Sequence, residues 1–330
     1  MITVVGESLV DVVAARGAGE PAAHPGGSPA NVAVALSRLG QRTGLVTQIG
    51  ADHYGGLIRA HLQRNGVQVI LAGPTSVPTS RALARLDAQG AATYQFELDW
   101  DVHEPRLVEG SIALHVGSLG VLLAPGGHQV RRLVESVSRR ADVVTSYDPN
   151  VRPSVTPDRR RVAAAVEWVA ARSHIVKMSD EDLAFLFPDT TPGQLARRLL
   201  GADARAQLLV VTRGSQGAFV ASRGARFSVP AVPVAIVDTV GAGDAFMAAL
   251  LAGLADLRLL SPRALGEQAA ADERALRDIV GQALAAAALT CTRPGADPPT
   301  ARELRSFRPS AWPAPPSTYS TSAPPQPDPG

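Results

Sequence analysis

The sequence predicts an α/β fold, with a doubly wound, mostly parallel sheet, helices on both faces and a small β appendage. Three observations predict it. Along most of the 330 residues, apolar strand patterns alternate with stretches of helical spacing. Residues 208–212 form an apolar run, as expected for a parallel strand covered on both faces. Residues 67–98 interrupt the alternation with short runs and a turn sequence at 88–90, which is typical of an inserted hairpin.

The order of the elements follows from this periodicity. Strand patterns cover residues 2–13, 44–49, 111–116, 142–147, 174–178 and 208–212. Helical spacing covers residues 32–39, 54–65, 128–140, 159–171, 180–187 and 272–290. Short alternating runs, which we assign to the appendage, cover residues 67–72, 81–87 and 93–98. Gly40 and Gly66 stand directly after the first two helices, where glycine commonly ends a helix.

Composition narrows the class of function. Lys and Arg number 32 against 30 Asp and Glu, and a net charge of +2 is weak evidence for a nucleic-acid partner. The single cysteine excludes an internal disulfide framework and a cysteine-rich zinc site. No basic segment opens the chain, and no uncharged run reaches the roughly 18 residues that a membrane span needs. We therefore expect a cytoplasmic protein with one domain over residues 1–307 and a Pro-rich, disordered tail over 308–330.

Residues 238–246, Asp-Thr-Val-Gly-Ala-Gly-Asp-Ala-Phe, are the most informative stretch of the chain. Gly241 and Gly243 precede a helix whose first N–H groups point outward, so an anion can approach those donors closely. A carboxylate at Asp244 would repel a bound phosphate, but it suits a group that takes a proton from a hydroxyl attacking a phosphoryl group. The alternative is a helix N-terminus whose glycines only allow close packing.

This stretch resembles the signature of the ribokinase-like (PfkB) family of carbohydrate kinases. The resemblance implies that Asp244 is the base for the sugar hydroxyl. It also implies that the amides of Gly241, Ala242 and Gly243 form an anion hole for the transferred phosphoryl group. Asp238 matches the first Asp of the signature, which supports the turn and, in many members, a site for a monovalent cation such as K⁺.

A second motif, residues 26–31 (Gly-Gly-Ser-Pro-Ala-Asn), resembles the N-terminal signature of the same family, which precedes an Ala-rich helix. Taken alone, it is a loop that leads into an apolar helix. Gly26 and Gly27 let a sugar lie against the backbone, and Asn31 can both donate and accept hydrogen bonds. Asp11 matches the family acid that binds sugar hydroxyls, and its alternative is a plain acid at the end of a strand.

A third motif, residues 147–153 (Tyr-Asp-Pro-Asn-Val-Arg-Pro), presents polar side chains at the carboxyl end of a strand, where α/β proteins usually bind ligands. It resembles the Asp-Pro-Asn-x-Arg segment of fructokinase-like and 2-keto-3-deoxygluconate-kinase-like members. The resemblance implies a phosphate or substrate contact for Arg152, whereas a plain Pro-Asn turn is the alternative. In the lid, Tyr94 and Phe96 look fructokinase-like, and Arg81 could pair with the carboxylate of a sugar acid.

A fourth motif, residues 177–182 (Lys-Met-Ser-Asp-Glu-Asp), opens a helix with Ser179 as its N-cap and acids in its first turn. The run resembles the Lys-x-Ser-Asp-Glu segment of fructokinase-like members and aligns with the family motif Asn-x-x-Glu, which orders magnesium. The resemblance implies a Mg²⁺ position at Ser179 and Asp182, with Glu181 as the nearby alternative, and a nucleotide contact for Lys177.

Two further segments resemble the nucleotide site of the family. The strand that ends at Thr212 borders the nucleotide there, which implies contacts from Thr212, Gly214 and Gly217. The loop after the last helix lies beside adenine in the family, which implies a contact from Cys291. As local structure, Cys291 is a small apolar residue rather than a nucleophile. The implied cosubstrate is ATP, together with Mg²⁺.

We therefore expect an ATP-dependent sugar kinase of ribokinase-like fold, whose β lid comes mainly from residues 67–98, with 12–24 as a second candidate segment. Fructose, as a ketohexose, is the first candidate substrate, and 2-keto-3-deoxygluconate and ribose are alternatives. A non-catalytic sugar- or nucleotide-binding regulator is the alternative of another class, and it predicts loss of the base or of the anion hole. An exposed β lid favours a homodimer formed through it.

Overall fold

The computed structural model describes residues 1–13, 22–86, 92–201, 204–269 and 272–307. Its centre is a nine-stranded sheet with the order β13-β12-β11-β10-β9-β8-β1-β4-β5. The strands from β11 to β5 run parallel to their neighbours, and β12 and β13 are antiparallel. Their bounds are β1 (Ile2–Val5), β4 (Thr43–Thr47), β5 (Gln68–Leu71), β8 (Ala113–Gly117), β9 (Val144–Asp148), β10 (Ile175–Ser179), β11 (Leu208–Thr212), β12 (Ala218–Ser222) and β13 (Arg226–Val229).

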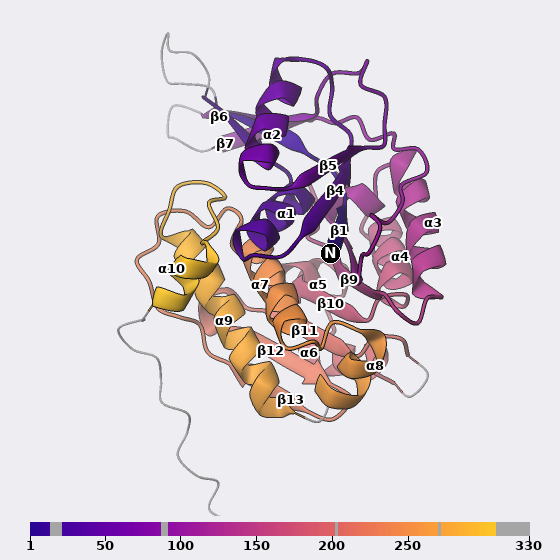
Figure 1. The fold of residues 1–330 in the computed structure, drawn as a ribbon, viewed down its shortest axis with the longest axis vertical. Helices are drawn as coiled ribbons and strands as arrows, with labels where there is room; N and C mark the ends of the chain where they lie inside the picture. The colour runs from indigo at the N-terminus through magenta and orange to yellow at the C-terminus, as the bar shows by residue number, and fades with distance from the viewer. Residues whose placement is uncertain (14–21, 87–91, 202–203, 270–271, 308–330) are drawn as a thin grey trace, which may run out of the picture.

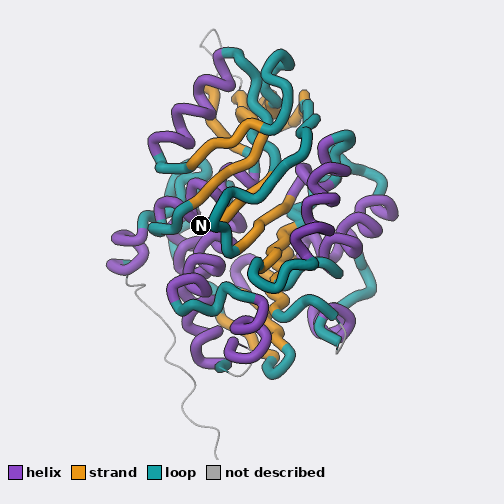
Figure 2. The backbone as a smooth tube through the Cα atoms, turned by 45° about the vertical axis from the view of Figure 1, so that its right-hand side comes forward, coloured by secondary structure: helices purple, strands orange, loops and turns teal. Residues whose placement is uncertain are grey.

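Helices cover both faces of this sheet (Figures 1 and 2), which confirms the predicted doubly wound architecture. The helices that pack into one core are α1 (Ser28–Arg38), α2 (His53–Arg64), α7 (Ala242–Asp256) and α9 (Glu273–Cys291). Those of the opposite core are α3 (Gly126–Ser138), α4 (Arg159–Ala170), α5 (Asp180–Leu186) and α6 (Pro192–Leu199). The short helices α8 (Pro262–Ala264) and α10 (Ala301–Ser306) lie outside these layers.

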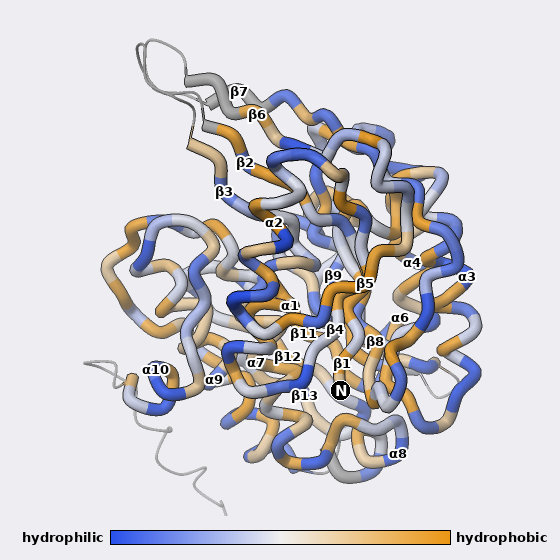
Figure 3. The backbone as a smooth tube through the Cα atoms, turned by 45° about the horizontal axis from the view of Figure 1, so that its top comes forward, coloured by the Kyte–Doolittle hydropathy of each residue, from blue (hydrophilic) through white to orange (hydrophobic). Residues whose placement is uncertain are grey.

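Helix α7 is the centre of the first core, because α1 and α9 both pack against it. Phe246, Met247, Leu250 and Leu251 are buried along its length. A helix that is apolar on all sides must be buried, and burying one such side chain contributes roughly 1.5–3 kcal/mol. Figure 3 shows the contrast between the hydrophobic strands of the sheet and the more hydrophilic outer helix α3. The tight packing of α7 therefore fixes its N-terminal end, at Ala242.

A second sheet has four strands in the order β3-β2-β6-β7. Their bounds are β2 (Leu9–Val13), β3 (Ala22–Gly26), β6 (Arg81–Leu86) and β7 (Ala92–Glu97). It lies at the opposite end of the molecule from α8 (Figures 1 and 3). β6 and β7 pair antiparallel, as the hairpin pattern predicted, whereas the turn itself lies outside the described residues. The tail expected over 308–330 also lies outside them.

The structure corrects two predicted strands. The single strand expected over 2–13 is two strands in two different sheets, β1 and β2. At the break, the backbone of Gly6 passes against the start of α1, because a Cβ on Gly6 would lie 2.2 Å from Pro29 Cγ. The run 67–72, assigned to the appendage, forms β5, which pairs with β4 as the edge strand of the large sheet.

Of the helices in the described ranges, none combines the length and the hydropathy that crossing a membrane requires.

Candidate active site

The candidate base lies in the first turn of α7. Gly241 is the residue before the helix, and its φ of +76° is a left-handed conformation that glycine adopts without a steric penalty. Asp244 follows three residues later, and its side chain is buried, with 6% of its surface exposed. The first amides of a helix have no earlier helical carbonyl to bond, and here the amide of Ala242 donates to the carbonyl of Thr239 at 3.2 Å. The predicted anion hole and the carboxylate occupy this one helix end.

The structure brings the two predicted motifs together at this carboxylate. Asn31 Nδ2 donates a hydrogen bond of 2.9 Å to Asp244 Oδ2, and Ser28 Oγ donates one of 2.6 Å to Asp244 Oδ1. Both donors come from the first turn of α1, which packs against α7. Ser28 is not among the residues predicted for the site. The signal that could have found it is a hydroxyl inside the motif that also supplies Asn31.

The glycines of the second motif lie against the other predicted sugar residue. Strand β2 pairs with β3, so that a Cβ on Gly26 would lie 2.4 Å from Asp11 Oδ2. Gly27 has a φ of +100°, and a Cβ there would lie 2.7 Å from the carbonyl oxygen of Glu7. Burial raises the pKa of Asp11, while the positive charges of His24 and Arg152 oppose that rise. Asp11 therefore lies against the backbone of Gly26 and Gly27, which we call the glycine wall, and α1 begins at the next residue.

A buried ion pair lies beneath the anion hole. Lys177 Nζ is 2.7 Å from Asp148 Oδ2, and the two side chains are 5% and 2% exposed. A Cβ on Gly243 would lie 3.1 Å from the same Nζ, which places the ammonium group next to the start of α7. Burial alone would lower the pKa of Lys177, but the negative charges of Asp148, Asp182 and Asp244 outweigh it and raise the pKa. The lysine is therefore held in its charged form next to the predicted anion hole.

Asp148, unlike Lys177, has a buried polar atom that makes no hydrogen bond with the described residues. Burial raises its pKa to about 6, against the opposing charge of Lys177. Its Oδ1 is buried and has no hydrogen-bond partner among the described residues. A buried carboxylate oxygen without a partner is costly, so such an atom points to a ligand or ion that binds there.

Ser179 and Asp182, the predicted magnesium residues, form a reciprocal cap at the start of α5. Ser179 Oγ accepts from the amide of Asp182, and Asp182 Oδ2 accepts from the amide of Ser179 at 3.1 Å. Asp182 Oδ1 accepts from the amide of Val151 at 2.8 Å, so both carboxylate oxygens bond backbone amides. Glu181 is exposed in the same turn. In the described ranges no group of three or more His, Cys, Asp or Glu is arranged to hold a metal ion, and the magnesium assignment stays a prediction.

The predicted nucleotide residues lie at the carboxyl end of β11 and in the loops around it. Thr212 pairs in register with Ser179 at the end of β10, and Gly214 begins the turn that follows. Gly217 has a φ of +82°, and a Cβ there would lie 2.0 Å from Val229 O, so this glycine is required by packing whether or not it touches a ligand. The carbonyl of Cys291 accepts from the amides of residues 237 and 238, which ties the end of α9 to the loop that leads to the predicted anion hole.

The side chain of Asp238 bonds two backbone amides in the loops next to the predicted anion hole. Its Oδ1 accepts from the amide of Val240 at 3.0 Å, and its Oδ2 accepts from the amide of Gly295 at 2.8 Å. These backbone hydrogen bonds lower the pKa of Asp238, with the bond to Val240 as the largest cause. The predicted support of the turn is therefore present in the geometry, whereas the cation site stays a prediction.

The remaining predicted substrate residues are less central. Arg81, on β6, forms an ion pair of 2.7 Å with Glu97 across the β6–β7 pairing. Phe96 is half-buried on β7, and Tyr94 is on the same strand, although its side chain lies outside the described residues. Arg152 follows β9 with an exposed side chain, and its Nη1 donates to Asn150 Oδ1 at 2.6 Å.

A buried acid that the sequence analysis did not assign lies between the two sheets. Glu7 Oε2 accepts from the amide of Gly120 at 2.8 Å, and burial raises its pKa to about 7 despite hydrogen bonds from Ser118 and Gly120. The carbonyl oxygen of Glu7 lies against Gly27, where a Cβ would come within 2.7 Å of it, so Glu7 borders the glycines of the second motif. An acid directly after an apolar strand and a glycine was the only signal available for it.

Comparisons with known proteins agree with this geometry. The family model described as pfkB family carbohydrate kinase matches residues 1–302. The chain is 34% identical to a fructokinase of Rhizobium leguminosarum bv. trifolii over 288 residues, which cover 84% of this chain and 86% of the relative. The family model thus covers most of the chain, and the relative matches along most of its own length.

Two solved structures extend the likeness to the fold. A fructokinase from Xylella fastidiosa with bound ATP superimposes with a TM-score of 0.81 at 25% identity, covering 92% of this chain and 97% of that one. A fructokinase from Vibrio cholerae O395, in a form with fructose, ADP and calcium bound, gives 0.73 at 27% identity, covering 89% and 94%. The chain therefore belongs to the pfkB family of carbohydrate kinases, as a fructokinase-like member.

Proposed function

We propose that this chain transfers the γ-phosphoryl group of ATP to a hydroxyl of a ketohexose, with fructose as the first candidate. The observation that carries the proposal is the position of Asp244, a buried carboxylate at the start of α7 whose two oxygens accept from Ser28 and Asn31. The choice of substrates is supported by the relative named fructokinase and by the neighbour solved with fructose and ADP.

In the proposed reaction, Asp244 takes the proton of the attacking hydroxyl. The hydroxyl oxygen forms a bond to the γ-phosphorus while the bond from that phosphorus to ADP breaks, and ADP leaves with the electron pair. The amides of Gly241, Ala242 and Gly243, at the start of α7, would stabilise the charge on the transferring group, and the amide of Ala242 would exchange its bond to Thr239 for one to that group. Lys177 adds a fixed positive charge beside Gly243.

The two substrates would approach this turn from opposite sides. Asp11, Gly26, Gly27 and Asn31 line the side toward the small sheet and would hold the sugar, with Arg152, Phe96 and Tyr94 as outer contacts. The carboxyl end of β11 and the loop after α9 would hold ATP, through Thr212, Gly214, Gly217 and Cys291. The small sheet would act as a lid that excludes water, which otherwise competes with the sugar as acceptor.

A magnesium ion fits this site as a companion of ATP rather than as a resident of a preformed cage. Mg²⁺ commonly binds through one or two carboxylates together with phosphates and several waters. Asp148 offers a buried carboxylate oxygen without a partner among the described residues, whereas both oxygens of Asp182 bond amides. We therefore propose Asp148 as the carboxylate, with Ser179, Asp182 and Glu181 reaching the ion through water. When bound, the ion would neutralise phosphate charge.

Three finer assignments belong to the same proposal. A monovalent cation such as K⁺ would bind near Asp238, where the carboxylate holds the loop around it. A homodimer would form through the small sheet, whose outer strands β3 and β7 each present an edge. A ketohexose is favoured over a sugar acid, because Arg81 and Arg152 already bond Glu97 and Asn150.

The direct test is an ADP-release assay on the wild type and Asp244→Asn, with fructose, tagatose, ribose, 2-keto-3-deoxygluconate and adenosine as acceptors. We expect turnover of fructose and a loss of about 10²–10⁴-fold in Asp244→Asn, with calorimetric sugar binding retained. The matched control is Asp278→Asn, at an exposed position of α9. Turnover that survives Asp244→Asn would overturn the base assignment, and no turnover of any acceptor would overturn the kinase proposal.

A further inference from the structure

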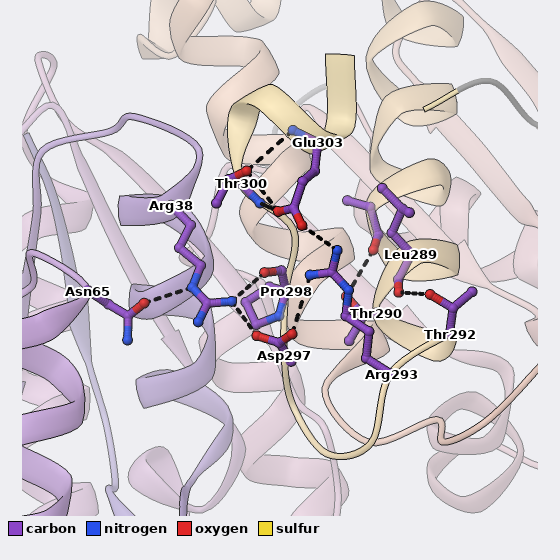
Figure 4. Close-up of polar contacts among 11 residues, drawn as sticks. Arg38, Asn65, Leu289, Thr290, Thr292, Arg293, Asp297, Pro298, Thr300 and Glu303 are labelled. Carbon is purple, nitrogen blue, oxygen red and sulfur yellow. Dashed lines mark hydrogen bonds and ion pairs between the residues drawn. The ribbon is translucent and has the colours of Figure 1, made fainter. Parts of the chain in front are cut away.

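A network of charged side chains ties the last turn of α1 to the loop after α9 (Figure 4). Arg38 Nη1 donates to Asp297 Oδ1 at 2.5 Å and to the carbonyl of Pro298 at 2.6 Å, while its Nε donates to Asn65 Oδ1 at 2.7 Å. Arg293 Nη1 reaches the other oxygen of Asp297 at 3.3 Å. The side chains of both arginines are only 23% exposed, so the network is held within the protein surface rather than spread over it.

The same loop is packed against the anion hole. A Cβ on Gly241 would lie 2.7 Å from the Cβ of Ala296, so the two backbones are in direct contact. One residue earlier, the amide of Gly295 donates to Asp238. The loop at residues 295–296 therefore contacts both Asp238 and Gly241, the two ends of the turn before Asp244. A displacement of this loop would remove the packing that holds the backbone of Gly241 in place.

These contacts close a ring around the candidate site. The first turn of α1 bonds Asp244 through Asn31, and the last turn of α1 bonds Asp297 through Arg38. We propose that Arg38 is a positioning residue for phosphoryl transfer: through Asp297 it holds residues 295–297 against Gly241 and thereby keeps the anion hole aligned with Asp244. The inference rests on the proposed function, since it assigns a task to the anion hole.

The contacts of Arg38 with Asp297 and Pro298, which we call the Arg38 clamp, are not needed to hold the rest of α1 in place. Val32 and Leu36 are fully buried in the core, and the helix packs against α7 along its length. Removing Arg38 would leave Ser28 and Asn31 in place, and with them the sugar side of the site. The effect should therefore fall on the nucleotide side, where the loop and Gly241 lose their support.

The test compares Arg38→Ala, Arg38→Lys, Asp297→Ala and the double variant Arg38→Ala/Asp297→Ala. We expect kcat/KM for ATP to fall about 10- to 100-fold in Arg38→Ala, as for a small misplacement of reacting groups, with the Kd for fructose unchanged within about twofold. Arg38→Lys should lose less than Arg38→Ala, because its ammonium group keeps a positive charge for Asp297. It should still fall short of the wild type, because one ammonium group cannot bridge Asp297 and Asn65 together. The double variant should lose no more than the worse single variant, since both act through one contact.

Arg140→Ala, which removes the exposed Arg140–Asp142 pair, is the matched control and should leave both constants unchanged. A kcat/KM for ATP in Arg38→Ala equal to that of the wild type would contradict the positioning role of Arg38. Equal losses for ATP and fructose together with a lowered Tm would also contradict it, because they indicate a merely structural role. Losses that multiply in the double variant would contradict it as well.

Calorimetry with a non-hydrolysable ATP analogue separates this proposal from the proposed function. If the wild type transfers no phosphoryl group but Arg38→Ala weakens analogue binding about tenfold, the clamp stands and the proposed function fails.

Discussion

Ser28 Oγ and Asp244 Oδ1 are 2.6 Å apart, although 216 residues separate them in the chain. Asn31 bonds the second oxygen of the same carboxylate, so both oxygens have a fixed direction before any substrate arrives. Hydrogen bonds to an ionised group are shorter and stronger than neutral ones. The candidate base is therefore oriented by the helix that also carries Asn31, one of the predicted sugar residues.

Removing the hydroxyl of Ser28 should release one oxygen of Asp244 from this orientation. We expect Ser28→Ala to lower kcat about tenfold or more, as loss of a hydrogen bond to a charged group allows, with KM for ATP unchanged. Steady-state kinetics check this. Ser28→Thr, which keeps a hydroxyl at the same place, is the control and should retain more activity than the alanine variant. Equal kcat in Ser28→Ala and the wild type would contradict an orienting role.

The glycine wall of the sugar site gives a second prediction. A Cβ at Gly26 would lie 2.4 Å from Asp11 Oδ2, so Gly26→Ala should displace that carboxylate and raise KM for the sugar at least about tenfold. Gly56, on an exposed side of α2, has no atom within 4 Å of its Cβ position. Gly56→Ala should therefore leave KM unchanged and stabilise the fold by roughly 0.5–1 kcal/mol. Steady-state kinetics and urea unfolding of both variants test these expectations. A KM for the sugar in Gly26→Ala equal to that of the wild type would contradict the close contact between Gly26 and Asp11.

Stability should depend on pH through Glu7. Burial raises its pKa from 4.5 to about 7, so between these values the folded chain holds a proton that the unfolded chain has lost. The free energy of unfolding contributed by this group therefore falls as pH rises from about 4.5 to about 7, by about 3 kcal/mol in all, and is constant above. Glu7→Gln removes this dependence and keeps an oxygen for the amide of Gly120.

Urea unfolding of the wild type and Glu7→Gln between pH 4.5 and 8 measures the effect as a difference, in which the titration of other groups, Asp148 included, cancels. The difference should shift in favour of the variant with rising pH. Glu109→Gln, at an exposed position, is the control. A difference that stays constant over the whole range would show that Glu7 is not titrating in this window.

The buried pair beneath the anion hole gives a fourth prediction. Lys177→Met leaves the carboxylate of Asp148 buried without its partner at 2.7 Å, which should cost about 3–5 kcal/mol of unfolding free energy. The double variant Lys177→Met/Asp148→Leu should recover part of that loss, because no charge is then left unpaired. Neither variant should retain activity. If Lys177→Met is as stable in urea as the wild type, the buried ion pair between Lys177 and Asp148 does not stabilise the fold.

Local patterns predicted most of the fold because they depend on neighbours in sequence. The apolar run at 208–212 is a buried strand, and the small-residue stretch after Gly243 is a buried helix. The sequence could not separate β1 from β2, because both halves of 2–13 have strand character, and the sheet that each half joins depends on strands distant in the chain. The edge strand β5 was misplaced for a related reason, since its half-buried alternation looks the same in either sheet.

In the site, motif residues could be predicted where a backbone signature surrounds them, as for Asp244 and Asn31. Residues that act through long-range partners could not. Nothing local in the sequence shows that Ser28 reaches Asp244, or that Lys177 pairs with Asp148. Asp182 has the opposite problem, because a helix cap and a magnesium residue share the same local pattern, and only the bonds of its two oxygens show the cap.

Helix α1 bonds Asp244 at its first turn and Asp297 at its last, across 11 residues, or about 16 Å of helix. Its length is therefore a fixed dimension of the molecule. Adding or deleting one residue would turn Arg38 by about 100° around the helix relative to Asn31, so that only one of the two contacts could form. Both contacts constrain the number of residues between Asn31 and Arg38, and every residue of α1 is buried or half-buried.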